Sequence, residues 1–114
     1  MGVAPFDLEA HAPLREFGFY WSPLKVFEYM ACGLPVVTID VHPLNMIVRS
    51  GQEGVLYPSG DVVALAQRIK ELAADREARE RMGASGRERV VAHYSWRAHC
   101  EALDGILRRI TNKL

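Results

Sequence analysis

The sequence predicts an α/β fold in which about three parallel strands are followed by helices. Short apolar runs alternate with helical patterns in the first half of the chain, and only helical patterns follow. This alternation is typical of a parallel sheet whose strands are joined by helices. Three strands make half of a usual doubly wound sheet, so we expect residues 1–114 to form part of such a domain.

The first strand and a long loop are predicted at the start of the chain. Gly2 to Phe6 is a short apolar run interrupted by a proline, which indicates a strand. The segment from Asp7 to Tyr20 contains Pro13 and Gly18 and has no clean period. We therefore expect a loop there, with room for one helical turn.

The segment SPLKVFEYMACG predicts a helix with well-marked ends. Ser22 is a preferred helix-capping residue, and Pro23 suits the first helical position. Gly33 ends the helix well, because glycine takes the left-handed conformation of a C-terminal cap at low cost. We expect the helix to run from Pro23 to Cys32.

Two more strands are predicted after this helix. Leu34 to Ile39 is a continuous run rich in β-branched residues, which is typical of a strand buried on both faces. A turn that contains Pro43 and a short helical piece, Met46 to Arg49, lead to the third strand at Val55 to Tyr57.

The rest of the chain predicts three helices. Asp61 caps the first, in which apolar residues recur at three- and four-residue steps. The second covers roughly Glu77 to His93, and its charges of both signs predict a solvated face. Ser95 caps the third, from Trp96 to about Thr111. Tyr94 and the tryptophan at the start of this last helix are expected to anchor it to the core.

The composition is that of an ordinary soluble globular protein, with 49% hydrophobic and 25% charged residues. Fourteen basic and fourteen acidic residues give no net charge, which argues against nucleic acid or an anionic membrane as the main partner. No apolar run is long enough to cross a bilayer, and the start of the chain lacks the pattern of a signal peptide. We expect a cytoplasmic protein.

The amino end of the helix that begins near Ser22 is a candidate anion site. In parallel α/β sheets, ligands bind at the carboxyl ends of the strands, which this end of the helix faces. The free backbone amides between Pro23 and Val26, together with the helix dipole, favour an anion, and Lys25 adds a positive charge. The arrangement predicts a site for a phosphate or a diphosphate.

Glu28 lies one turn further along the helix, at the border of the face on which Leu24, Phe27 and Ala31 are expected to be buried. A carboxylate accepts two hydrogen bonds in a plane, as the two hydroxyls of a ribose require. The alternative is an exposed ion pair with Lys25, which contributes only about a few tenths of a kcal/mol. The pattern by itself favours this alternative, because glutamates are mostly exposed.

Three segments, in this order, resemble the carboxyl-terminal domain of the family-4 glycosyltransferases of the GT-B fold (the glycosyl transferases of group 1). They are FYWSPLKVFEYMACGLPVVTID, EGVLYPSGDVVALAQRI and REARERMGASGRERVVAHYSW. The resemblance implies a Rossmann-like domain and a retaining transfer of sugar from a nucleotide-sugar donor to an acceptor, with no metal ion or other cofactor. It also implies a first half of this domain and an acceptor domain beyond these residues, so the isolated chain is expected to be inactive.

The resemblance also assigns roles to individual residues. Four of them match the loop and helix start that hold the diphosphate, mainly through backbone amides: Ser22, Pro23, Leu24 and Lys25. Glu28 matches the glutamate that binds the ribose hydroxyls. Tyr20 stands where the family usually has a glutamate that contacts the donor sugar, so no catalytic residue is assigned. Tyr20 favours an alternative function, a non-catalytic nucleotide-binding or assembly module that kept the fold.

Two surfaces are expected to lack a neighbour. A parallel strand with an open edge is a site of association, so we expect the chain to self-associate through Gly2 to Phe6. In the family, the last helix crosses back towards the first domain, and within these residues it has nothing to dock on.

Overall fold

The strands and helices alternate as predicted, and the strands pair in parallel. The computed structural model describes residues 1–19 and 22–113. Its elements in chain order are β1 (Gly2–Ala4), α1 (Ala12–Phe17), α2 (Leu24–Ala31), β2 (Val36–Ile39), α3 (Leu44–Ile47), β3 (Gly54–Tyr57), α4 (Val62–Ala74), α5 (Arg76–His93) and α6 (Trp96–Thr111). The strand order is β1-β2-β3, and Val37 pairs with Val3 on one side and Val55 on the other. The predicted fold class is confirmed.

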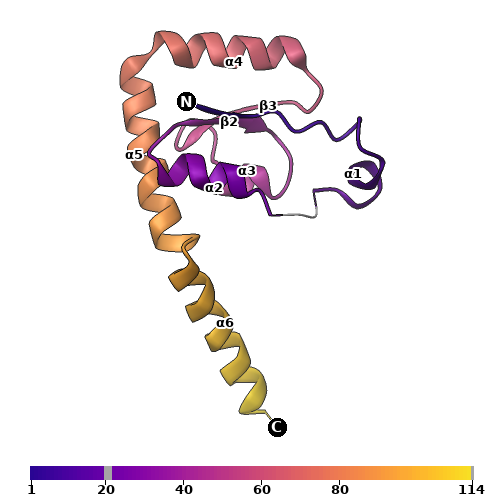
Figure 1. The fold of residues 1–114 in the computed structure, drawn as a ribbon, viewed down its shortest axis with the longest axis vertical. Coiled ribbons are helices and arrows are strands. Elements are labelled where there is room, and N and C mark those ends of the chain that lie inside the picture. The colour runs from indigo at the N-terminus through magenta and orange to yellow at the C-terminus, as the bar shows by residue number, and fades with distance from the viewer. Residues whose placement is uncertain (20–21, 114) are drawn as a thin grey trace.

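The sheet lies between two layers of helices. α4 covers one face, α2 and α3 cover the other, and α5 runs past the sheet from α4 to α2 (Figure 1). All four residues of β2 are buried, as predicted for a central strand with helices on both faces. Asp61 and Ser95 cap α4 and α6 by accepting hydrogen bonds from the amides of Ala64 and Ala98, as predicted.

The predicted anchoring of the last helix is only half right. Tyr94 is partly buried, and its ring packs against Phe27 with the ring centroids 5.1 Å apart. Trp96, however, is 81% exposed, and none of the residues of α6 is buried. The helix extends away from the layers (Figure 1), because it begins after α5 has already passed the sheet.

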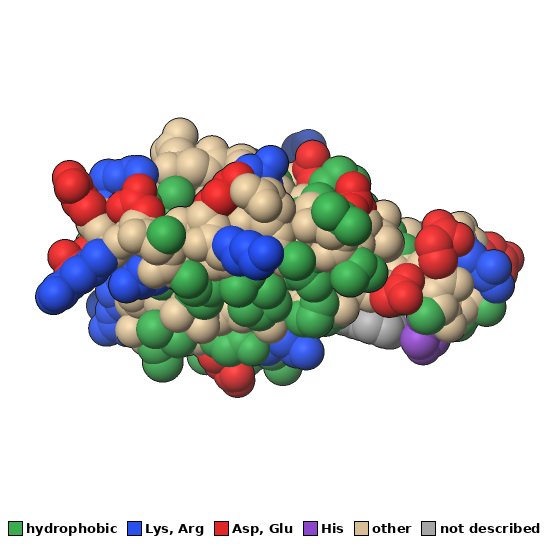
Figure 2. Space-filling model, turned by 90° about the horizontal axis from the view of Figure 1, so that it is seen from above, with side chains coloured by type: hydrophobic (Ala, Val, Ile, Leu, Met, Phe, Trp, Pro, Cys, Tyr) green, Lys and Arg blue, Asp and Glu red, His purple; other side chains and the backbone are tan. Residues whose placement is uncertain are grey.

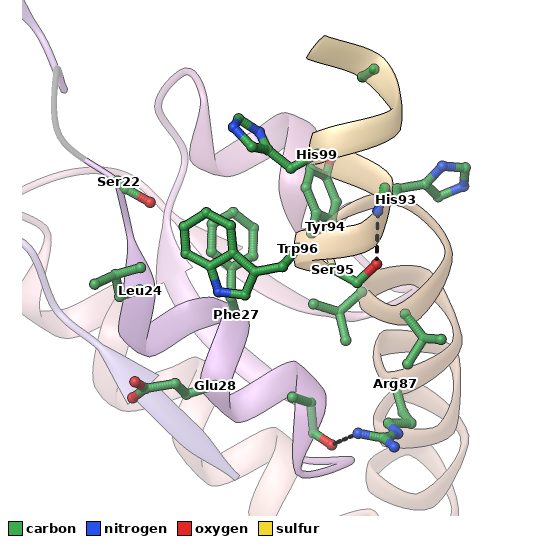
Figure 3. Close-up of a pocket in the computed structure, with 15 residues that line it drawn as sticks. Ser22, Leu24, Phe27, Glu28, Arg87, His93, Tyr94, Ser95, Trp96 and His99 are labelled. Atoms are coloured by element: carbon green, nitrogen blue, oxygen red, sulfur yellow. Dashed lines mark hydrogen bonds between the residues drawn. The ribbon is translucent and has the colours of Figure 1, made fainter. Parts of the chain in front are cut away.

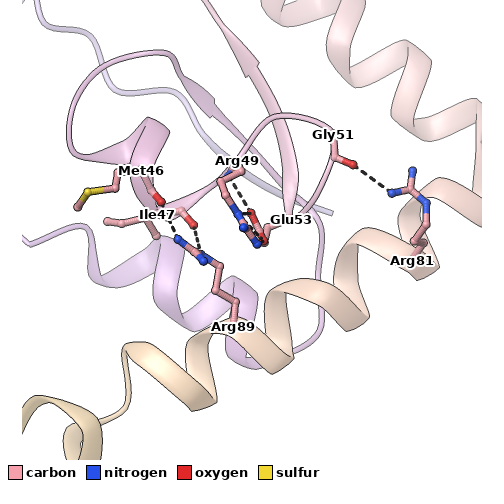
Figure 4. Close-up of polar contacts among 7 residues, drawn as sticks. All are labelled: Met46, Ile47, Arg49, Gly51, Glu53, Arg81 and Arg89. Atoms are coloured by element: carbon pink, nitrogen blue, oxygen red, sulfur yellow. Dashed lines mark hydrogen bonds and ion pairs between the residues drawn. The ribbon is translucent and has the colours of Figure 1, made fainter.

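Most charged side chains of α5 are exposed, as the composition predicts, but its arginines also bind other segments. Four of them donate hydrogen bonds to backbone carbonyls of other segments: Arg79 to Leu72, Arg81 to Gly51, Arg87 to Ala31, and Arg89 to Met46 and Ile47. Figure 4 shows two of these arginines. The acceptors in α2, α3 and α4 lie in the last turns of those helices, where carbonyls lack intrahelical partners and a positive charge is favourable. α5 therefore caps three other helices.

α5 also approaches α2 closely, because Gly83 of α5 lies against Gly33, which follows α2. A Cβ atom on Gly83 would lie only 2.1 Å from the carbonyl oxygen of Gly33. Gly33 follows α2 with a φ of +70°, the left-handed conformation predicted for the residue that ends this helix. A side chain at position 83 would separate α5 from α2.

A buried carboxylate, which the sequence analysis did not identify, lies just before β3. Glu53 is 0% exposed and accepts hydrogen bonds from the backbone amide of Arg49 (2.8 Å) and from its Nε (3.1 Å) (Figure 4). Burial by itself raises the pKa of Glu53, but the hydrogen bonds and the charge of Arg49 outweigh burial and hold the pKa below its ordinary value. Arg49 is thus the partner of a buried charge.

The surface over α4 carries no large patch of one charge. In the view from above, acidic and basic side chains are interspersed around apolar ones (Figure 2). Val62 and Val63 at the start of α4 are 73% and 80% exposed. In the part of the chain that the structure describes, no helix combines the length and the apolar character needed to cross a membrane.

We expect Gly83→Ala to lower the free energy of unfolding by about 2 kcal/mol, because the added methyl overpacks the contact with Gly33. Gly105→Ala is the matched control, since no atom lies within 4 Å of a Cβ added in α6. The control should leave stability unchanged or raise it by about 0.5–1 kcal/mol, as replacing a helical glycine does. Denaturant titrations followed by circular dichroism measure both; equal stability of the two variants would contradict the role of the crossing.

We expect Arg49→Met to be strongly destabilising at pH 7, because it leaves the charge of Glu53 buried without its guanidinium partner. In the unaltered chain the folded-state pKa of Glu53 is lowered from 4.5, so the pair stabilises above that pH and the contribution is lost as the pH falls. In the variant the carboxyl is desolvated without a partner, so its pKa is raised and acidification should relieve the defect.

Unfolding midpoints between pH 4 and pH 8 test this expectation. Arg76→Met is the control, since the Arg76–Glu80 pair is largely exposed (83% and 66%) and such pairs contribute little. The loss of stability in Arg49→Met should be several times that of the control at pH 7. If the loss of stability in Arg49→Met does not change with pH, the buried carboxylate of Glu53 is not its cause.

Candidate nucleotide site

α2 begins one residue later than predicted, and Ser22 does not cap it. Pro23 is the N-cap residue, with φ −81° and ψ 65°, and no side chain accepts a capping hydrogen bond. The amide of Leu24 donates to the carbonyl of Ser22 (3.0 Å), and the amide of Val26 to that of Pro23 (2.9 Å). A serine hydroxyl reaches the first amides of a helix only from the N-cap position. Ser22 lies one residue outside that position.

Among the described residues, the anion site at this end of the helix offers fewer unbonded backbone amides than predicted. Of the amides from Leu24 to Val26, that of Lys25 alone has no acceptor among the described residues. The Nζ of Lys25 lies 5.1 Å from the centroid of the Phe6 ring, and Phe6 packs edge-on against Phe19 at 4.8 Å. The ammonium therefore lies beyond the carboxyl end of β1, where ligands of parallel α/β sheets bind.

The carboxylate of Glu28 is free. Glu28 is exposed, and it makes no ion pair or side-chain hydrogen bond with any residue that the structure describes. The alternative that the pattern favoured, an ion pair with Lys25, is wrong, because the ammonium of Lys25 faces the Phe6 ring instead.

The face of α2 that packs on the sheet also differs from the prediction. Val26 and Met30 are fully buried, whereas Leu24 is 63% exposed. Phe27 and Ala31 are only partly buried. The reason is that α2 contacts the sheet on one side and α5 on another. Its buried face is therefore rotated relative to the face that packing against the sheet alone would bury.

A groove of about 770 Å³ lies between α2, α5 and α6, and Glu28 is one of its lining residues (Figure 3). Most of the lining is apolar and includes Leu24, Phe27, Val91 and Trp96. In Figure 3 the carboxylate of Glu28 points away from Trp96. Glu28 is therefore a polar group beside an apolar groove rather than at its centre.

α6 brings residues to this groove that the sequence pattern does not connect with α2. His99 lines it, and its ring contacts that of Trp96 edge to face at 5.8 Å. Tyr20, at the position of the family's first glutamate, lies outside the described residues. Within residues 1–19 and 22–113, no group of three or more His, Cys, Asp or Glu side chains is arranged to hold a metal ion.

The comparisons with known proteins agree with the resemblance noted in the sequence. The model of the family described as glycosyl transferase-like matches residues 11–105. The phosphatidyl-myo-inositol mannosyltransferase of Mycobacterium leprae is 41% identical over 98 residues, 79% of this chain and 26% of the relative. The α-maltose-1-phosphate synthase of Mycolicibacterium smegmatis is 32% identical over 99 residues, 80% of this chain and 26% of the relative.

A solved structure is similar as well. The sucrose-phosphate synthase of Thermosynechococcus elongatus superposes with a TM-score of 0.75 and 32% identity, covering 82% of this chain and 23% of that one. The chain thus spans about a quarter of the length of these relatives. With three parallel strands between helices and a family model that matches most of its residues, the chain belongs to the glycosyl transferase-like family, as half of a GT-B Rossmann-like domain.

Proposed function

We propose that the chain is the nucleotide-sugar-binding part of a retaining glycosyltransferase. Membership of the glycosyl transferase-like family supports this proposal, and so do the names of its relatives, among them a mannosyltransferase. The donor is a nucleoside diphosphate sugar, and the acceptor binds to a part of the enzyme outside these residues. The observation that carries the proposal is the carboxylate of Glu28, which no described residue pairs with, one turn beyond the start of α2.

The diphosphate binds at the start of α2. The amide of Lys25, which has no acceptor among the described residues, donates one hydrogen bond to the diphosphate, and the Lys25 ammonium, beyond the end of β1, supplies a positive charge. The dipole of the helix adds to the attraction. When the bond between the sugar and the diphosphate breaks, negative charge builds up on the leaving phosphate, and these same groups stabilise it.

The ribose binds to Glu28. Its carboxylate has both oxygens available, because no described residue pairs with it. One helical turn, a rise of about 5.4 Å, separates it from the start of the helix, which suits a ribose joined to a diphosphate. Glu28 holds and orients the donor and takes no part in the chemistry.

A second function fits the same site. Tyr20 in place of the family's glutamate favours a module that binds a nucleotide but transfers no sugar, since a phenol is neutral at pH 7 and cannot act as a carboxylate. Both functions require the same contacts from Lys25 and Glu28.

We expect Glu28→Gln to weaken the binding of nucleoside diphosphates by at least about tenfold, because an amide replaces one acceptor oxygen by a donor and removes the charge-assisted hydrogen bonds. The unaltered chain should also prefer a ribonucleoside diphosphate to its 2′-deoxy form, and the variant should lose this preference. Isothermal titration calorimetry of the chain with UDP, GDP, ADP and the matching deoxynucleotides measures both effects.

Two further variants sharpen this experiment. Lys25→Met should weaken the ribonucleotide and the deoxynucleotide equally, since it acts on the diphosphate. Glu101→Gln changes an exposed glutamate on α6 and should change nothing. Equal affinity of the unaltered chain and Glu28→Gln, or a ribose preference that survives in the variant, would show that Glu28 does not bind the ribose.

A further inference from the structure

α6 carries a continuous apolar face that nothing in the described chain covers. Five large side chains form it, and we call this set the α6 seam: Trp96 (81% exposed), Leu103 (47%), Ile106 (44%), Leu107 (53%) and Ile110 (55%). They recur at three-, four- and seven-residue steps and so lie along one side of the helix. Monomeric proteins rarely leave so large a contiguous apolar patch in water.

The seam continues into the apolar groove at the base of α6. Trp96 belongs to both, and Leu24 (63% exposed) and Val91 (54%) extend the apolar surface over α2 and α5. Stable protein–protein interfaces bury about 800 Å² on each partner. Seven large apolar side chains, each roughly half exposed or more, supply a surface of that order. The patch is therefore large enough for a stable dimer.

The spacing of the seam fits a second copy of the same helix. Leu103 lies midway between Trp96 and Ile110, seven residues from each. When two copies pair antiparallel about Leu103, Trp96 of one lies against Ile110 of the other, Ile106 lies against Cys100, and Leu107 lies against His99. Leu103 then meets its own copy on the two-fold axis, and Trp96 and Ile110 cover each other on both sides of it, as a two-fold interface requires.

We propose that the 114-residue chain forms a two-fold symmetric dimer in which the α6 helices pair antiparallel through the α6 seam. The helix extends away from the layers (Figure 1), so two copies can approach without moving any other element. Asp104 and Arg108 pair with each other on α6 (2.6 Å), outside the seam, and need no partner from the second copy. In a longer chain with a first domain, that domain competes for the same face, so the proposal concerns the chain of 114 residues.

The edge of β1 offers less to a second copy than the α6 seam. The carbonyl of Val3 already accepts a hydrogen bond from the hydroxyl of Tyr29 (3.4 Å), and the Tyr29 ring lies against Gly2. The strand itself is only three residues long. Association through Gly2 to Phe6 stays a separate prediction, and the experiment below distinguishes the two surfaces.

Sedimentation equilibrium of the chain between about 1 and 100 μM tests the proposal. We expect a dimer at micromolar concentration, and at least a tenfold weaker dimer for Leu103→Asp and for Ile110→Asp, because each places a charge in the seam. Val63→Asp is the matched control, since Val63 is an exposed apolar residue (80%) on α4, outside the seam, and it should not change the dimer. Far-UV circular dichroism checks that each variant is folded.

The orientation has its own test. In Ile106→Cys, the antiparallel arrangement should give a disulfide between the native Cys100 and the new thiol of the second copy, identified by peptide mapping after mild oxidation. Links between identical positions would instead indicate a parallel pair and overturn the orientation.

Three results would overturn the proposal itself. One is a monomer at all concentrations. Another is association that survives both charged variants, which would indicate β1 instead. The third is binding of the monomer to vesicles of phosphatidylcholine and phosphatidylglycerol that is lost in Leu103→Asp, which would identify the seam as a membrane-binding face.

Discussion

The close crossing of α5 on α2 is the contact on which the rest of the structure depends. It exists because Gly83 lies against the backbone of Gly33, where no side chain fits. At this distance Arg87 reaches the last carbonyl of α2, and further along the same helix Arg89 reaches those at the end of α3. The arginines of α5 thus donate hydrogen bonds to the last carbonyls of neighbouring helices, which local capping residues or water usually satisfy.

The geometry of the candidate site follows from this crossing. With its far end fixed by α5 and its inner face filled by Val26 and Met30, α2 has only one orientation relative to the sheet. That orientation sends Lys25 to the carboxyl end of β1 and leaves Glu28 facing solvent beside the groove. The ion pairs among the described residues include neither of these two charged groups, so both stay available to a ligand.

Local signals predicted the order of elements and several helix ends, but contacts between distant segments decided the rest. Asp61 and Ser95 cap their helices as their sequence positions indicate, because a cap depends on neighbouring residues alone. Ser22 fails as a cap because Pro23 takes a non-helical ψ and moves the helix start by one residue. No sequence pattern marks Glu53 as buried, and Leu24 was expected to be buried but is exposed. Their environments are set by Arg49 and by the direction of α5, which no local pattern contains.

The exposed state of α6 limits how stable that helix can be by itself. It has 16 residues, a glycine in its middle and no buried side chain, and isolated helices of about this length are marginal in water. Its own side-chain interactions include the Ser95 cap and the Asp104–Arg108 pair, each of which contributes only about 1 kcal/mol or less. Most helical stability in proteins comes from packing an apolar face. A partner that covers the α6 seam therefore both binds the helix and holds it folded, so association and helix formation are a single coupled equilibrium.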